Sequence, residues 1–226
     1  MKKFSVLLFA FGLLLGCEQT GESGGETATS SEATANAEQE QAEDPSRFVA
    51  IDSDEALIAT ALMAAPAESR ENCTVIGYNM AGDFVTLKEG SNAFICLADD
   101  PNKKGFNAAC YHKNLEPFMA RGRALKAEGK SPQEIFDIRE QEAKAGTLDM
   151  GGSGSTLHVL YGPDATYDPA TGEVPGAVYR YVVYMPFATA ESTGLPERPI
   201  APNHPWIMDP GTHRAHIMIS PINESE

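Results

Sequence analysis

Basic residues and cysteines are scarce in this sequence of 226 residues. Lys and Arg number 17 against 32 Asp and Glu, which gives a net charge of −15. A chain this acidic repels nucleic-acid phosphates and anionic lipid headgroups, so we expect no nucleic-acid partner and no peripheral membrane face. The cysteines number only four, but a domain of roughly 180 residues buries enough surface to fold without a metal or a disulfide.

No apolar run is long enough to span a bilayer. The longest, Phe4 to Leu15, follows two lysines and is followed by Gly16 and Cys17. A spanning helix needs about 20 apolar residues, whereas a run of about twelve after a basic end is typical of a signal peptide. The Ala-x-Ala pattern of an ordinary signal cleavage site is also missing. We therefore expect residues 1–16 to form a signal peptide of another type.

The segment around Cys17 resembles the lipobox of bacterial lipoproteins. That pattern has an aliphatic residue three positions before the cysteine and a small residue just before it, and Leu14 and Gly16 fit. The resemblance implies that Cys17 becomes the first mature residue and carries acyl chains, which hold the protein on a membrane of the bacterial cell envelope. Because Glu18 rather than Asp follows, it implies the outer membrane, facing the periplasm or the surface.

The stretch from Glu18 to Ser46 has no Lys, no Arg and no large apolar side chain, but it has eight acidic residues. Such a composition cannot bury enough apolar surface to offset the entropy of the chain. We therefore expect residues 17–47 to comprise the lipidated cysteine and a disordered acidic linker. Residues 48–226 are then expected to form a single globular domain.

The folded part mixes helix and strand patterns. An amphipathic helix is expected from Asp52 or Ser53 to Pro66, and a capping box at Ser131 and Glu134 opens another helix that Gly146 ends. Strands are expected in 73–78, 155–162, 177–188 and 213–220, and two more within 84–100, joined by a hairpin turn at 89–92. These patterns predict an α+β fold with a mainly antiparallel sheet and two to three helices packed to one side.

Three cysteines remain after lipidation, and an odd number leaves one without a partner. Cys96 closes an expected strand, Cys110 opens an expected helix, and the residues between them favour a loop. A bridge across such a loop would contribute about 3 kcal/mol. We expect a Cys96–Cys110 disulfide, with Cys73 as a buried free thiol.

The usual catalytic motifs are missing. Residues 151–155, Gly-Gly-Ser-Gly-Ser, lack the last glycine of G-x-S-x-G and the lysine of a P-loop, and no H-E-x-x-H occurs. The histidines offer the alternative, because imidazoles are good zinc ligands and an open zinc site can activate water. The candidate metal ligands are His158, His204, His213 and His216. Three residues apart in an expected strand, His213 and His216 point to opposite faces, so only one could join a shared site.

Two further groups could bind a ligand. The loop after Cys96 contains Lys103 and Lys104, a basic spot on an acidic domain, and its Asp99-Asp100 pair is typical of a turn rather than of a calcium loop. Tyr179, Tyr181 and Tyr184 together with Trp206 either line an aromatic groove for a sugar or peptide or pack within the sheet.

The folded part resembles a family of uncharacterised secreted bacterial proteins. The likeness rests on Ala64-Ala65-Pro66, on "LKEGSNAFICLADD" with Cys110, and on "PWIMDPGTHRAHIMI", and it covers roughly residues 61–219. Members usually have Gly-Trp where this chain has Ala93-Phe94, and they usually lack a cysteine at position 73. The resemblance therefore implies the Cys96–Cys110 pairing and no structural role for Cys73. It implies no particular activity.

We therefore expect an envelope lipoprotein, joined to a membrane through the lipid on Cys17, whose domain is a non-enzymatic binder of a small ligand or an envelope protein. No catalytic residue and no cofactor is assigned. The alternative is a hydrolase or metalloenzyme that uses the C-terminal histidines. Three converging imidazoles would favour that alternative.

Overall fold

A computed structural model describes residues 45–221 of the chain. The expected signal peptide, Cys17 and nearly all of the linker lie outside these residues. The elements, in chain order, are η1 (Pro45–Arg47), β1 (Val49–Ala50), α1 (Asp54–Met63), η2 (Ala67–Asn72), β2 (Thr74–Tyr78), β3 (Phe84–Lys88), β4 (Phe94–Leu97), β5 (Phe106–His112), η3 (Lys113–Leu115), α2 (Glu116–Ala127), α3 (Pro132–Lys144), β6 (Ser155–Gly162), β7 (Thr166–Tyr167), β8 (Val178–Tyr184), α4 (Ala190–Thr193), β9 (Trp206–Met208) and β10 (His216–Ile219).

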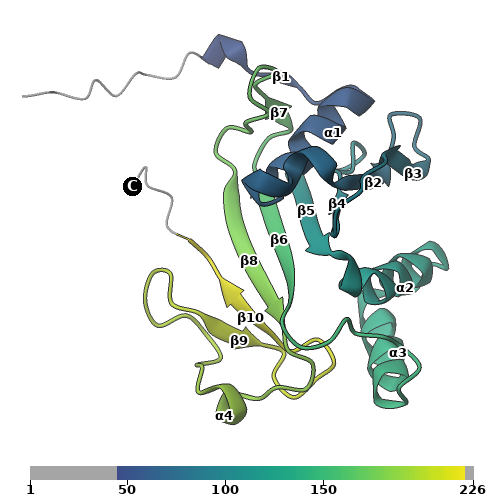
Figure 1. Ribbon diagram of the computed structural model, residues 1–226, viewed down its shortest axis with the longest axis vertical. Coiled ribbons are helices and arrows are strands. Elements are labelled where there is room, and N and C mark those ends of the chain that lie inside the picture. Colours follow the sequence, from purple (N-terminus) through teal and green to yellow (C-terminus); the bar gives the residue numbers. More distant parts are fainter. Residues whose placement is uncertain (1–44, 222–226) are drawn as a thin grey trace, which may run out of the picture. The chain divides into compact units, whose positions relative to one another are not determined.

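An eight-stranded sheet in the order β3-β2-β4-β5-β6-β8-β10-β9 forms the centre of the fold (Figure 1). Neighbouring strands run antiparallel except β2 and β4, which are parallel. The short strands β1 and β7 pair separately. The predicted α+β class with a mainly antiparallel sheet is confirmed.

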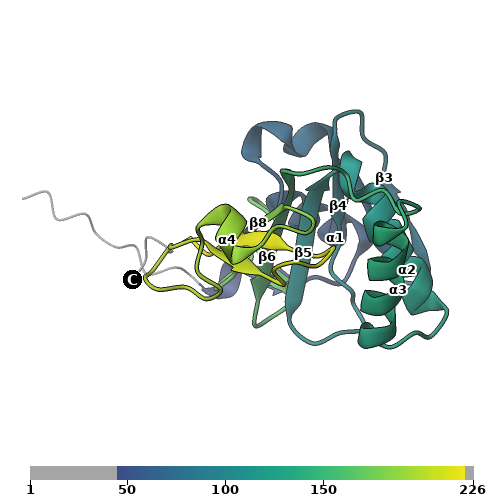
Figure 2. The same ribbon diagram turned by 90° about the horizontal axis from the view of Figure 1, so that it is seen from below.

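Helices cover both faces of the sheet. Leu57 and Ala61 of α1 pack with Val75 and Cys110 on one face. On the other, Phe118 of α2 belongs to a second buried cluster, whose other members are Tyr111, Leu115, Met150, Val182 and Tyr184. Because side chains alternate along a strand, neighbouring residues such as Cys110 and Tyr111 serve opposite faces. The two longest helices, α2 and α3, lie together on one side, as expected (Figure 2).

The predicted hairpin between β3 and β4 is wrong. Both strands pair with β2, one on each side of it. The connection crosses the start of β2, where the backbone N–H groups of Ser91 and Asn92 donate to the carbonyl of Asn72 at 2.9 and 3.1 Å. Gly90 allows this close crossing, because a Cβ atom there would lie 2.2 Å from the backbone nitrogen of Thr74. The sequence predicts the bend at residues 89–92, but β3 and β4, which this bend connects, do not pair with each other because β2 lies between them.

The cysteines pair as expected, although their setting differs. Cys96 and Cys110 form a disulfide and stand directly opposite each other on β4 and β5. Cys110 therefore lies inside a strand and does not open a helix. Cys73 is a buried free thiol whose Sγ donates to the carbonyl of Ser69 at 3.1 Å.

Several predicted helix ends are confirmed. Ser53 caps α1, and Ser131 with Glu134 forms the capping box of α3. Gly146 follows α3 with a φ of +71°, the left-handed conformation that favours glycine. Within the described residues, no helix has the length and apolar character needed to cross a membrane.

Candidate functional site

The histidines proposed as metal ligands lie on different parts of the fold. His158 is on β6, where its ring meets the edges of Phe94 and Tyr181 at centroid distances of 6.1 and 5.3 Å. Burial lowers the pKa of His158, so it is neutral at pH 7. His204 lies in the loop before β9, with Nδ1 2.7 Å from the carbonyl oxygen of Pro205.

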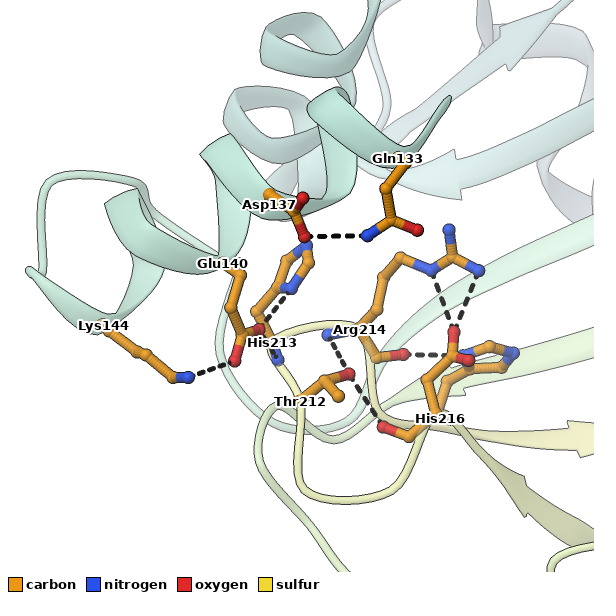
Figure 3. Close-up of polar contacts among 9 residues, drawn as sticks. Gln133, Asp137, Glu140, Lys144, Thr212, His213, Arg214 and His216 are labelled. Carbon is orange, nitrogen blue, oxygen red and sulfur yellow. Dashed lines mark hydrogen bonds and ion pairs between the residues drawn. The ribbon is translucent and has the colours of Figure 1, made fainter. Parts of the chain in front are cut away.

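His213 is fully buried and joins α3 to the loop before β10 (Figure 3). Its backbone N–H and its Nδ1 both lie against Oε2 of Glu140, at 2.7 and 2.6 Å. Its ring packs on Phe136 and Phe118, with centroids 4.8 and 5.9 Å away. Nε2 is buried and has no hydrogen-bond partner among the residues that the structure describes. A ring enclosed in this way cannot reach a molecule in solvent, so its role is to fasten the loop to the helix.

His216 is separate from His213 (Figure 3). Its Nδ1 lies 2.7 Å from the carbonyl oxygen of Arg214, and its ring packs on Tyr184 with the centroids 5.6 Å apart. Nowhere in the part of the chain that the structure describes do three or more His, Cys, Asp or Glu side chains form a group that could hold a metal ion. The four histidines therefore do not converge.

A cleft of about 740 Å³ lies between α2 and the half of the sheet that carries β2, β3, β4 and β5. We call it the α2 cleft. Its volume is within the ~300–1,000 Å³ of typical small-molecule sites. Its lining consists of Gly77, Tyr78, Phe84, Leu97, Ala98, Asp99, Asp100, Lys103, Lys104, Asn107, Ala109, Arg123, Ala124, Lys126 and Ala127.

Aromatic side chains form one wall of the α2 cleft. Tyr78 and Phe84 meet edge to face, with centroids 5.3 Å apart. The guanidinium of Arg123 lies over the Phe84 ring at 5.6 Å. Phe84 is 44% exposed, so part of its ring is open to solvent beside the apolar lining of the cleft. The site therefore offers a flat apolar surface next to fixed positive charge.

Four cations surround the α2 cleft against two carboxylates. Lys103 pairs with Asp100 at 2.8 Å, and Arg123 pairs with Glu116 of the same helix. Lys104 and Lys126 have no ion pair within the described residues, which leaves their charges available to a ligand. The four cations and two carboxylates of the lining sum to +2, opposite in sign to the net charge of −15 of the chain.

The loop that carries the lysines has a defined shape. The disulfide closes it at both ends, and the N–H of Lys103 donates to the carbonyl of Asp100 at 2.8 Å. Oδ1 of the buried Asp99 accepts a hydrogen bond from the N–H of Asn107 at 2.9 Å. Burial raises the pKa of Asp99, because the charged carboxylate loses its hydration. The predicted turn is present from Asp100 to Lys103, and Asp99 directly precedes it.

The sequence indicated the loop that carries Lys103 and Lys104, but it did not indicate the other walls of the α2 cleft. Tyr78, Phe84 and Arg123 come from separate segments that only the fold brings together. One signal was present, because Arg123 and Lys126 are three residues apart and so share a face of α2.

The predicted aromatic groove exists in part. Tyr179 and Trp206 line an open groove of about 730 Å³, together with His204. Tyr181 instead stacks on Tyr179, at a centroid distance of 6.1 Å. Tyr184 is buried on the face of the sheet that α2 covers. The groove is more open than the α2 cleft and has fewer charged residues in its lining, so it is the weaker candidate for a ligand-binding site.

Comparison with protein-family models, with curated proteins and with solved structures finds no match to this chain. The resemblance to a family of secreted bacterial proteins therefore stays a prediction.

Proposed function

We propose that this protein is a lipid-anchored binding protein of the bacterial envelope, and that its domain takes up a small amphipathic anion in the α2 cleft. The observation that carries the proposal is the composition of that cleft. An exposed aromatic wall and an apolar floor lie beside Lys104 and Lys126, two lysines with no ion pair in the described part of the chain.

The chemistry of the α2 cleft favours a ligand with an aromatic or alkyl body and one acidic group. Burying apolar area against Phe84 and Leu97 would supply most of the affinity, at about 25 cal/mol for each Å² removed from water. A contact with Lys104 would fix the orientation of the acidic group, and a charge-assisted hydrogen bond of this kind contributes about 1.5–3 kcal/mol. Long-range repulsion by the acidic domain would disfavour polyanions.

The remaining features of the proposal come from the sequence. The lipobox-like segment supports attachment through Cys17, and the acidic linker supports a domain that stands away from the headgroups. The proposal assigns no catalytic residue and no cofactor to the domain.

Calorimetric titration with 2-naphthalenesulfonate tests the proposal, using the full chain in a non-ionic maltoside detergent. We expect saturable binding that weakens about tenfold in Lys104→Glu, because the charge-assisted contact becomes a repulsion. Lys113→Glu is the matched control, since Lys113 is also exposed but lies outside the cleft. The neutral analogue 2-naphthalenemethanol should bind more weakly than the sulfonate. Equal affinities of the wild type and Lys104→Glu would refute the assignment of the cleft.

A further inference from the structure

Arg139 of α3 is a buried cation that has no carboxylate partner among residues 45–221. The residue is 9% exposed, and its Nε finds no hydrogen-bond partner in that part of the chain. Its guanidinium lies over the ring of Phe118 at 4.1 Å, and Nη1 makes one long hydrogen bond, 3.4 Å, to the carbonyl of the same residue. The nearby Glu142 is held by Arg121 at 2.7 Å. An unpaired buried charge is costly, so its retention calls for an explanation.

Gly122 makes room for this guanidinium. It lies inside α2, where a glycine costs about 1 kcal/mol relative to alanine. A Cβ atom at residue 122 would lie 2.9 Å from Nη1 of Arg139. The surface of α2 is therefore recessed where the guanidinium rests.

A pocket of about 360 Å³ opens beside Arg139, between α2, α3 and the ends of β8 and β10. We call it the arginine pocket. Its lining consists of Phe118, Met119, Gly122, Arg123, Lys126, Ile135, Arg139, Tyr184, Arg214 and His216. The lining contains four permanent cations and no Asp or Glu.

Two of these cations already have partners, and two do not. Arg123 pairs with Glu116, and Arg214 pairs with Asp209 at 2.9 Å. Arg139 and Lys126 have no ion pair among residues 45–221. The uncompensated charge therefore lies on α2 and α3, on either side of the pocket.

We propose that the arginine pocket binds a phosphate group, either free or on a small phosphomonoester. A guanidinium presents its N–H donors in a planar fork that matches two oxygens of a tetrahedral oxoanion. Lys126 lies on the facing helix, and Tyr184, whose hydroxyl can donate, lies at the end of β8. His216 also lines the pocket, but its Nδ1 faces the carbonyl oxygen of Arg214 and burial lowers its pKa, so the neutral ring offers no second donor. Donors from α3, α2 and β8 suit the oxygens of a tetrahedral phosphate better than those of a planar carboxylate.

The arginine pocket does not depend on the proposed function of the α2 cleft. The two share Arg123 and Lys126, but Arg139 lines only the arginine pocket and Lys104 only the α2 cleft. Substitutions at these two positions therefore separate the sites. Lys104→Glu should leave phosphate binding unchanged, and removal of the Arg139 charge should leave naphthalenesulfonate binding unchanged.

Calorimetric titration with inorganic phosphate, and separately with glycerol 3-phosphate, tests the proposal on the full chain in a phosphate-free maltoside detergent. We expect saturable binding that falls at least about tenfold in Arg139→Met. Tighter binding of glycerol 3-phosphate would identify a phosphomonoester as the ligand, and tighter binding of inorganic phosphate would identify the free ion. The control is Arg198→Met, which removes an exposed cation outside the pocket.

Thermal unfolding separates a binding role from a structural one. Replacing a buried unpaired charge by an apolar side chain is neutral or stabilising, so Arg139→Met should melt at or above the wild-type temperature. Lys126→Gln changes an exposed residue of the same pocket and should weaken phosphate binding without affecting folding. The proposal is overturned if the wild type binds neither probe, if acetate binds as tightly as phosphate, or if Arg139→Met and Lys126→Gln both bind phosphate like the wild type.

Discussion

Glu140 accepts two hydrogen bonds from His213 on the same carboxylate oxygen, one from the backbone N–H and one from Nδ1. Its other oxygen pairs with Lys144 at 2.6 Å. Partial burial alone would raise the pKa of Glu140, but the hydrogen bonds from Lys144 and His213 outweigh it and lower the pKa to about 2. The ionised carboxylate is therefore what holds α3 to the loop before β10.

This contact predicts an acid-sensitive contribution to stability. A carboxylate with a lowered folded-state pKa stabilises the fold above its ordinary value of 4.5 and loses that effect as the pH falls towards about 2. Glu140→Gln should therefore lower the free energy of unfolding by about 2 kcal/mol at pH 7. The difference from the wild type should shrink below pH 4.5 and disappear near pH 2.

Urea denaturation at several pH values measures the Glu140 effect. Asp137→Asn is a suitable control, because Asp137 lies on the same helix and accepts a hydrogen bond from the neighbouring side chain of Gln133, on the exposed side of α3 (Figure 3). We expect this control to change the free energy of unfolding by less than about 0.5 kcal/mol. A loss of stability in Glu140→Gln that stayed constant from pH 7 to pH 2 would contradict the assignment.

Local signals in the sequence predicted local structure well. The capping residues Ser53 and Ser131 and the C-terminal Gly146 depend on interactions within a few residues, so they could be recognised directly. The connection from β3 to β4 could not, because its path depends on contact with the distant Asn72. A turn pattern predicts where the chain bends, but it does not specify which strands pair in the sheet.

The candidate sites show the same limit. Lys103 and Lys104 could be identified as a basic loop because they are adjacent in the sequence. Arg139 could not, since a basic residue on an amphipathic helix is usually solvated. Its burial follows from the approach of α2 and α3 at Gly122, a contact between segments that no local pattern specifies.

The disulfide should contribute measurably to stability. Cys96 and Cys110 are 14 residues apart, so the bridge closes a short loop in the unfolded chain. Replacing both by alanine should lower the free energy of unfolding by about 3 kcal/mol. Cys73→Ala should cost less, because it leaves only a small cavity. Denaturation under non-reducing conditions compares the variants, and peptide mapping that found Cys73 joined to either partner would refute the pairing.

Gly90 should tolerate no side chain. A Cβ atom would overlap the backbone of Cys73 and Thr74, at 2.3 and 2.2 Å, and backbone atoms cannot rotate away as a side chain can. We expect Gly90→Ala to lower the free energy of unfolding by about 3 kcal/mol. Gly129→Ala is the comparison, because it has a φ of +79° and no neighbour within 4 Å, so it should cost only about 1 kcal/mol. Equal losses in the two variants would show that the crossing over β2 is looser than described.

The proposed membrane anchor should depend on a single sulfur atom. If the lipobox-like segment is processed as proposed, Cys17 alone can form the thioether for the acyl chains, and serine at this position cannot replace it. Cys17→Ser should therefore abolish incorporation of a fatty-acid analogue during metabolic labelling in a bacterial host. Cys73→Ala is the matched control and should label like the wild type, because its buried thiol belongs to the folded domain. Persistent labelling of Cys17→Ser would show that the acyl chains are attached elsewhere, and the proposed anchor would have to be abandoned.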